Sequence, residues 1–172
     1  MNIREWLNNN PRITTAVTAI VIVLAVIVIV WNRSSQESGP SSGYRVYYSD
    51  DDGKTWFADD WQKVPPFDHN GRQAVRAHVF RIGTGEPFVG YLEKFDARAQ
   101  KILNDFYNDP ANRGKFYNER HTLEARNILV KRPGPEHKWV HVEQDREQAY
   151  RIKTITGPAG ETAEELFPKR EY

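Results

Sequence analysis

Cysteine is absent from this sequence of 172 residues, and several kinds of chemistry are absent with it. Disulfide bonds, thiolate nucleophiles and cysteine-ligated zinc sites all require a residue that the chain does not contain. A strong net charge is also lacking, because 24 lysines and arginines face 23 aspartates and glutamates. Nucleic-acid binding favours a basic face, so no nucleic-acid partner is expected. The sequence further lacks a P-loop, a G-x-S-x-G nucleophile elbow and an H-E-x-x-H motif, so no catalytic residue or cofactor site is predicted.

One long uncharged run differs from the rest of the chain, Ile13–Trp31, in which nearly every residue after Thr18 is valine, isoleucine, leucine or alanine. At about 1.5 Å per residue, a helix over this run would span roughly 28 Å, close to the hydrocarbon thickness of a bilayer. The run is longer than the roughly 7–15 residues of a signal-peptide core, and no A-x-A-like cleavage site follows it. We therefore predict a single transmembrane helix, a signal-anchor, in a cell membrane. A cleaved signal peptide and a buried soluble helix are the alternatives.

Charges on either side of this run indicate the orientation of the chain. Arg4 and Arg12 precede it, whereas Arg33 follows directly and Arg45 lies further on. By the positive-inside rule, residues 1–12 form a cytoplasmic tail and the large C-terminal domain lies outside the cytoplasm. The margin is only one or two charges, so a domain that faces the cytoplasm is the alternative.

A linker and one domain follow the predicted anchor. Residues 32–43, NRSSQESGPSSG, are rich in serine and glycine, which is typical of a flexible tether. The remaining chain is long enough for one single-core domain and too short for two ordinary ones. We assign this domain to residues 44–157 and expect residues 158–172 to form a loosely ordered C-terminal tail.

The start of the domain predicts a β-hairpin. Aromatic and β-branched residues lie on both sides of Asp52-Gly53, a pair suited to a type I′ turn because both of its residues take positive φ. In that register Tyr48 faces Phe57 across the two strands, which is a favourable cross-strand pair.

The rest of the domain predicts an antiparallel sheet with one main helix. Asp96 is a suitable N-cap, and apolar residues at helical spacing favour a helix through about residue 107. Successive hairpins favour antiparallel pairing, since parallel strands need long crossovers. The predicted fold class is therefore α+β, with five or six antiparallel strands and one main helix on one face. Beyond the first hairpin, strands are expected at 74–82, 88–92, 126–131 and 138–142, and a short helix at 143–150.

The most specific local pattern is S-x-D-x-G-x-T-W, carried by Ser49, Asp51, Gly53, Thr55 and Trp56. It resembles the Asp-box, which recurs in sialidase-like and related β-propellers and occurs singly in other extracytoplasmic folds. In those families the box is a structural brace: its aspartate and serine tie the turn of a hairpin while the aromatic residue packs beneath it. A propeller needs several four-stranded blades, and this domain is too short for them, so the resemblance implies the brace and not the glycosidase chemistry. A small carbohydrate-active or other hydrolytic enzyme that uses the acidic loop near Trp56 is the alternative.

The same acidic loop allows a calcium site. In an EF-hand frame with Gly53 at the sixth position, Asp50 and Asp52 occupy the third and fifth positions. The first position is then Tyr48 and the twelfth is Asp59 rather than glutamate, so two main ligands are missing or weakened. Calcium bound by Asp50, Asp52 and Asp59 is therefore a secondary hypothesis, and no other metal site is predicted.

Three tryptophans, Trp56, Trp61 and Trp139, are candidates for ligand stacking. Exposed aromatic side chains on a sheet stack on sugars or anchor a protein partner. Buried, the same side chains would belong to the core of a small domain, and this is the favoured alternative.

A group of basic residues surrounds one of the predicted hairpins. Such charge usually forms a solvated face, and the alternative is a patch that binds anionic lipid or an acidic partner. The group comprises Arg126, Lys131, Arg132 and Lys138.

The order of anchor, tether, YYSDDDGKTWF, FDHNGRQAVRAHVFR and GYLEKF is similar to that of uncharacterised single-pass membrane proteins of planctomycete-type bacteria. The resemblance implies a bacterial envelope protein and adds no mechanism. We therefore expect a non-enzymatic binding or structural protein, held in the membrane by Ile13–Trp31, with a protein or a cell-surface polymer as its partner.

Overall fold

The computed structural model of the protein describes residues 44–112 and 115–169, which belong to one compact unit of the chain, Ser38–Tyr172. The predicted anchor at Ile13–Trp31 and the predicted linker at 32–43 lie outside the described residues. Within the described ranges, no helix is both long and apolar enough to cross a membrane.

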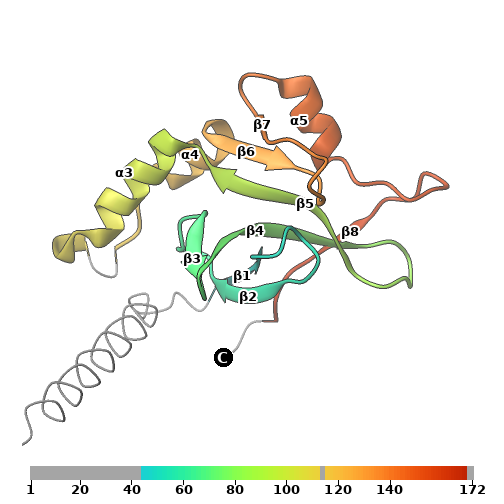
Figure 1. The fold of residues 1–172 in the computed structure, drawn as a ribbon, viewed down its shortest axis with the longest axis horizontal. Helices are drawn as coiled ribbons and strands as arrows, with labels where there is room; N and C mark the ends of the chain where they lie inside the picture. Colours follow the sequence, from blue (N-terminus) through green and yellow to red (C-terminus); the bar gives the residue numbers. More distant parts are fainter. Residues whose placement is uncertain (1–43, 113–114, 170–172) are drawn as a thin grey trace, which may run out of the picture. The chain divides into compact units, whose positions relative to one another are not determined.

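The described part of the chain is an α+β domain built on one antiparallel sheet, which confirms the predicted fold class at this level (Figure 1). The strands run in the order β2-β1-β4-β5-β6-β7, while β3 and β8 also pair with β4. The sheet thus has more strands than the five or six expected, because the sequence patterns did not predict the two short strands β3 and β8. The strands are β1 (Arg45–Ser49), β2 (Phe57–Asp60), β3 (Phe67–His69), β4 (Arg72–Arg81), β5 (Phe88–Phe95), β6 (Ile128–Lys131), β7 (Val140–His141) and β8 (Glu164–Leu166).

The helices gather around β5, β6 and β7, away from β1 and β2 (Figure 1). They are α3 (Ala97–Asn108), α4 (Arg120–Arg126) and α5 (Arg146–Lys153), with the short 3₁₀ helix η1 (Pro110–Asn112) after α3. The predicted N-cap of α3 is confirmed, because the Asp96 carboxylate accepts a hydrogen bond of 2.7 Å from the backbone N–H of Ala99. Ala99 and Leu103 are fully buried, which confirms that the apolar stripe of this helix faces the core.

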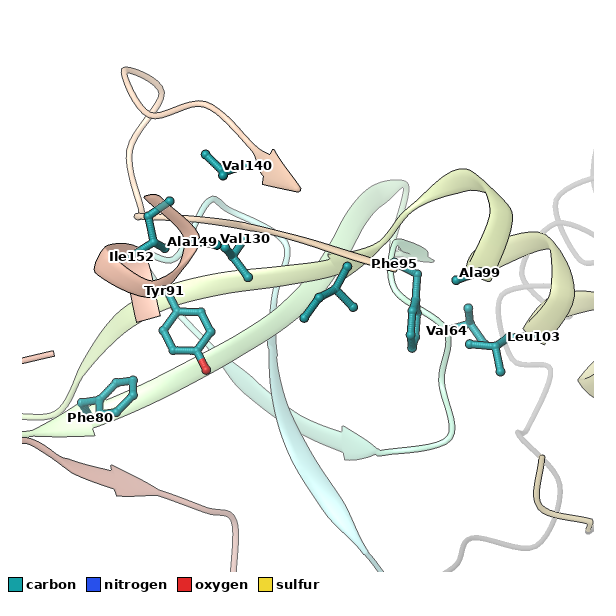
Figure 2. Close-up of a cluster of buried hydrophobic side chains, with 11 residues drawn as sticks. Val64, Phe80, Tyr91, Phe95, Ala99, Leu103, Val130, Val140, Ala149 and Ile152 are labelled. Carbon is teal, nitrogen blue, oxygen red and sulfur yellow. The ribbon is translucent and has the colours of Figure 1, made fainter. Parts of the chain in front are cut away.

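The long hairpin of β4 and β5 divides the core into two layers. On the helix face of the sheet, a large cluster joins β5 to α3 and α5, with Phe95 at the α3 end of the cluster and Tyr91 at the α5 end (Figure 2). On the opposite face, a smaller cluster packs beneath Trp56 and Trp139. A register shift between His78 and Val79 interrupts the β4 and β5 pairing, which allows the consecutive residues Val79 and Phe80 both to be buried.

Two expectations from the sequence are corrected near the second half of the chain. Arg126 was expected to begin a strand, but it ends α4, and the strand begins at Ile128. The only buried residue of α4 is Arg120, so this helix has no apolar stripe that a sequence pattern could detect. The predicted helix at 143–150 begins instead at Arg146, behind an Asp145 side chain that accepts a hydrogen bond from the Gln148 N–H.

The expectation for the C-terminal segment is also corrected. Residues 158–172 were expected to form a loosely ordered tail, but Glu164–Leu166 pairs with Val79–Arg81 as strand β8. Leu166 packs on the apolar cluster of the opposite face, and Glu165 turns toward the helix face. Glu164–Leu166 is therefore part of the sheet and pairs with the C-terminal half of β4.

Candidate functional site

The Asp-box-like hairpin has the hydrogen bonds that define a brace. The Asp51 carboxylate accepts bonds from the Ser49 hydroxyl at 2.9 Å, the Thr55 N–H at 2.9 Å and the Thr55 hydroxyl at 2.6 Å. The Gly53 N–H in turn donates to the Ser49 oxygen at 2.9 Å. Partial burial alone would raise the pKa of Asp51, but the bonds from Thr55 and Ser49 outweigh it and lower the pKa. All of these hydrogen bonds join residues of the same loop, as a structural brace requires.

The turn of this hairpin requires its glycine. Asp52 and Gly53 have φ angles of 65° and 83°, so the predicted positive-φ pair is confirmed, as is the cross-strand pairing of Tyr48 with Phe57. A Cβ atom on Gly53 would lie 3.0 Å from the ring of Pro133, whose loop follows β6. The hairpin therefore packs closely on a distant loop, and a larger residue at position 53 would be excluded by both conformation and space.

We expect the Asp51→Ala variant to lose about 2 kcal/mol of unfolding free energy, because three hydrogen bonds to one carboxylate are removed together. Chemical denaturation followed by far-ultraviolet circular dichroism measures the loss. Glu86→Ala in the exposed turn after β4 is the control, with an expected change within about 0.5 kcal/mol. An Asp51→Ala protein that kept its stability but lost a measured hydrolytic activity would contradict the brace and support an enzyme.

Each carboxylate of the calcium hypothesis lies against basic side chains of its own. Asp50 lies 2.7 Å from the His69 imidazole and 3.0 Å from the Arg72 guanidinium. Asp52 forms an ion pair with the buried Lys131, and Asp59 lies 2.6 Å from the Lys63 ammonium group. No group of three or more potential metal ligands occurs within residues 44–112 and 115–169.

The three candidate tryptophans lie in two different places. Trp56 and Trp139 are half-buried and pack on the cluster of the opposite face, where the Lys94 ammonium group lies 4.5 Å from the centre of the Trp139 ring. Trp61 follows β2 and belongs to a separate group of aromatic rings with Tyr44 and Phe116. The structure thus places two of the candidates in one layer and the third outside it.

The basic cluster predicted from the sequence is largely occupied by structural contacts. Lys131 is only 7% exposed and pairs with Asp52. The Arg132 guanidinium donates to the Gly90 carbonyl at 3.1 Å and to the Thr154 carbonyl at 2.9 Å, which ties β5 to the end of α5. Arg126 and Lys138 are exposed, so only part of the predicted patch faces solvent.

A chain of alternating charges that the sequence did not predict crosses the helix face of the sheet. Six side chains form it, beginning on α4, passing over β4 and β5 and ending on β8. Successive pairs lie 3.0 Å, 3.8 Å, 3.7 Å, 3.5 Å and 2.7 Å apart. We call this the ion-pair chain; in order its members are Arg120, Glu124, Arg76, Glu93, His78 and Glu165.

Two members of the ion-pair chain, Glu93 and His78, are buried groups whose pKa values are shifted in opposite directions. Burial alone would raise the pKa of Glu93, but the cations of His78 and Arg76 outweigh it and lower the pKa. Burial alone would lower the pKa of His78, but its contacts with the Glu165 and Glu93 carboxylates outweigh it and raise the pKa. The neighbouring groups therefore favour the charged form of both side chains. His78 also stacks on the Tyr91 ring at 4.1 Å, which fixes the plane of the imidazole.

This arrangement limits what the ion-pair chain can do chemically. A general base needs a carboxylate or imidazole whose proton acceptor is free to face a substrate. Here each nitrogen of His78 faces a carboxylate, and the Arg76 guanidinium lies between Glu93 and Glu124. The chain is thus arranged to connect α4, the central hairpin and β8, and we assign it a structural role.

A groove of about 420 Å³ lies between α3, α4 and β7. Ile102 and Leu123 contribute apolar surface, and Arg98 and Glu143 contribute opposite charges to its lining. His141 also lines it, but its Nε2 lies 3.2 Å from the Asp96 carboxylate and its Nδ1 accepts a hydrogen bond from the Glu143 N–H. The lining therefore carries both signs of charge and favours no single ligand.

No protein-family model matches the chain, and neither the curated proteins nor the solved structures contain a significant match. The resemblance to planctomycete-type membrane proteins therefore stays a prediction.

Proposed function

We propose that the protein is a membrane-anchored extracytoplasmic domain with a non-enzymatic binding or structural role in a bacterial envelope. The observation that carries the proposal is the uncharged run Ile13–Trp31, followed by the Ser/Gly-rich tether at 32–43. A run of this length matches the thickness of a bilayer, and such a tether separates an anchored domain from the membrane surface.

The contacts of the acidic residues support the non-enzymatic part of the proposal. Asp51 is used by the brace, Asp50 and Asp52 by ion pairs, and Glu93 by the ion-pair chain. A hydrolase that depended on the loop near Trp56 would need one of the three aspartates at 50–52 for its substrate. The partner that best suits the proposal is a protein or a cell-surface polymer, without a metal or organic cofactor.

The orientation is tested with two reporters fused after Tyr172 in a bacterial host. A phosphatase that is active only outside the cytoplasm is expected to be active, and a fluorescent protein that folds only in the cytoplasm is expected to stay dark. The protein is also expected to remain in the membrane fraction after alkaline extraction. The opposite pair of reporter signals would place the domain in the cytoplasm and favour the lipid-binding alternative that uses Arg126 and Lys138.

A matched variant sharpens this test because the predicted charge margin is small. Ser34→Lys and Ser35→Lys together add two positive charges directly after the run, and Arg4→Gln and Arg12→Gln remove two before it. The positive-inside rule predicts that the fourfold variant reverses both reporter signals. Loss of both the phosphatase signal and membrane association would contradict the anchor itself.

A further inference from the structure

Three aromatic rings form a partly exposed group at the beginning of the described chain. Tyr44 is 42% exposed, and its ring centre lies 6.4 Å from that of Trp61 in an edge-to-face arrangement. Phe116, in the segment before α4, is 44% exposed and lies 5.2 Å from Trp61. We call Tyr44, Trp61 and Phe116 the aromatic patch. Large apolar side chains that remain exposed together commonly mark a contact surface.

The patch is held in place by Arg120, the most deeply buried cation among the residues that the structure describes. The Arg120 guanidinium lies 4.9 Å from the centre of the Trp61 ring and donates to the Trp61 carbonyl at 2.8 Å. Arg120 is 2% exposed and also donates to the carbonyls of Gln62 and Lys63. The backbone that carries Trp61 is thus anchored to α4, so the central ring of the patch does not need to be ordered when a partner binds.

The charge beside the patch is suitable for a membrane surface. Lys115 precedes Phe116, is exposed, and pairs with no carboxylate in the described ranges. Aromatic rings with a polar edge favour the boundary between headgroups and acyl chains, and a lysine beside them can extend its ammonium group toward lipid phosphates. Tyr44 and Trp61 each have such an edge, whereas Phe116 adds a fully apolar ring.

The sequence keeps this patch close to a bilayer if the run Ile13–Trp31 is the anchor. The Ser/Gly-rich tether at 32–43 has an average reach of about 20 Å, and about 40 Å when fully extended. Tyr44, a member of the patch, follows it directly. A tether of this length gives the patch a high effective concentration at the lipid surface. Even a weak affinity for lipid would therefore keep the patch bound for most of the time.

We propose that the aromatic patch is a membrane-contact surface, by which the domain rests on the headgroup region of the bilayer that anchors it. The proposal rests on the anchor in the proposed function. It deepens that function by committing the patch to lipid, so that the other surfaces of the domain are presented to the envelope. The rings would enter about 5–10 Å into the boundary between headgroups and acyl chains, as interfacial aromatic side chains do.

The absence of cysteine allows a direct test with the full-length protein in phosphatidylcholine–phosphatidylglycerol vesicles. Single cysteines at three positions, Phe116→Cys, Tyr150→Cys and Ala25→Cys, are each labelled with nitrobenzoxadiazole. Spin-labelled lipids that carry the quencher at a shallow acyl position then report contact with the membrane. Tyr150 is the matched control, because it is also an aromatic residue and is 72% exposed on α5. Ala25 reports on the anchor.

We expect the labels at positions 25 and 116 to be quenched and blue-shifted, and the label at position 150 to show neither change. Quenching at 25 without quenching at 116 would overturn the membrane contact while the anchor stands. No quenching at any position would overturn the anchor and the contact together. Equal quenching at 116 and 150 would mean that the domain adheres without a preferred face, which also overturns the proposal.

A second variant separates the patch from its label. Tyr44→Ser in the Phe116→Cys background removes a neighbouring ring of the patch without changing the labelled position. We expect a partial loss of quenching at 116, with unchanged circular dichroism. Unchanged quenching would show that the label itself drives the contact and would count against the patch.

Discussion

Arg120→Met is expected to lower the unfolding free energy of the domain by about 3–5 kcal/mol. The Arg120 guanidinium donates to the carbonyls of Trp61, Gln62 and Lys63 at 2.8 Å, 2.9 Å and 3.1 Å. It also lies 3.0 Å from the Glu124 carboxylate. Methionine fills a similar volume but offers no donor, so buried acceptors and one carboxylate would lose their partner at once. Urea denaturation at neutral pH measures the loss.

Arg126→Met provides the matched control for this prediction. The substitution is the same and lies in the same helix, but Arg126 is exposed in the last turn of α4. Only a favourable interaction with the helix dipole is lost there, so the expected cost is below about 1 kcal/mol. Arg120→Lys should keep the charge but fall between the two, because one ammonium group cannot serve three carbonyls with a planar fork. Equal stability of the Arg120→Met and Arg126→Met proteins would contradict this account of Arg120.

Local signals in the sequence were sufficient where one residue type determines the backbone. Asp52-Gly53 predicted two positive φ angles because few other pairs adopt them, and the structure has both. The two-residue type I′ turn itself is not formed, because the strands end at Ser49 and begin again at Phe57 and a longer loop joins them. Asp96 predicted the start of α3 because its side chain accepts a bond from the first turn of the helix. Both devices act over four residues or fewer, so no knowledge of the rest of the fold was needed.

Elements that depend on distant partners could not be predicted in this way. Strand β8 is three residues long. Its ion pair with β4 joins Arg81 to Glu164, which lie 83 residues apart in the sequence. Its sequence has neither the length nor the alternation of a detectable strand. Helix α4 is held by Arg120 rather than by an apolar stripe. The stabilising contacts of these two elements are therefore long-range and polar.

The ion-pair chain was missed for a related reason. Arg76 and His78 alternate with the buried residues Ala77 and Val79 along β4, a pattern that predicts a solvated face. In the structure that face turns toward the helices. The side chains of Arg76 and His78 are stabilised there because the Glu93 carboxylate, from the neighbouring strand, faces both of them. One strand alone does not reveal which carboxylate will face it. The brace was predictable because all its partners lie within eight residues of sequence.

The buried contact between His78 and Glu93 predicts a large and pH-dependent coupling. Removing the carboxylate by Glu93→Gln leaves the cations of Arg76 and His78 without their central partner, at an expected cost of about 3–5 kcal/mol near neutral pH. A double-mutant cycle with His78→Gln isolates the pair, and we expect a coupling energy of about 2 kcal/mol at pH 5.5. The surface pair Lys101–Asp105, at 2.6 Å, is the control, with an expected coupling below about 0.5 kcal/mol.

The sign of the pH dependence follows from the two pKa shifts. The pKa of His78 is raised in the folded protein, so its contribution is complete below the unfolded value of about 6.5 and is lost as the pH rises through the folded value. The pKa of Glu93 is lowered, so its contribution is present above the unfolded value of about 4.3 and is lost as the pH falls through the folded value. The coupling should therefore be largest between about pH 4.5 and 6.5. A coupling that grew from pH 6.5 to pH 9 would mean that His78 is neutral in the folded state, and the ion-pair chain would then end at Glu93.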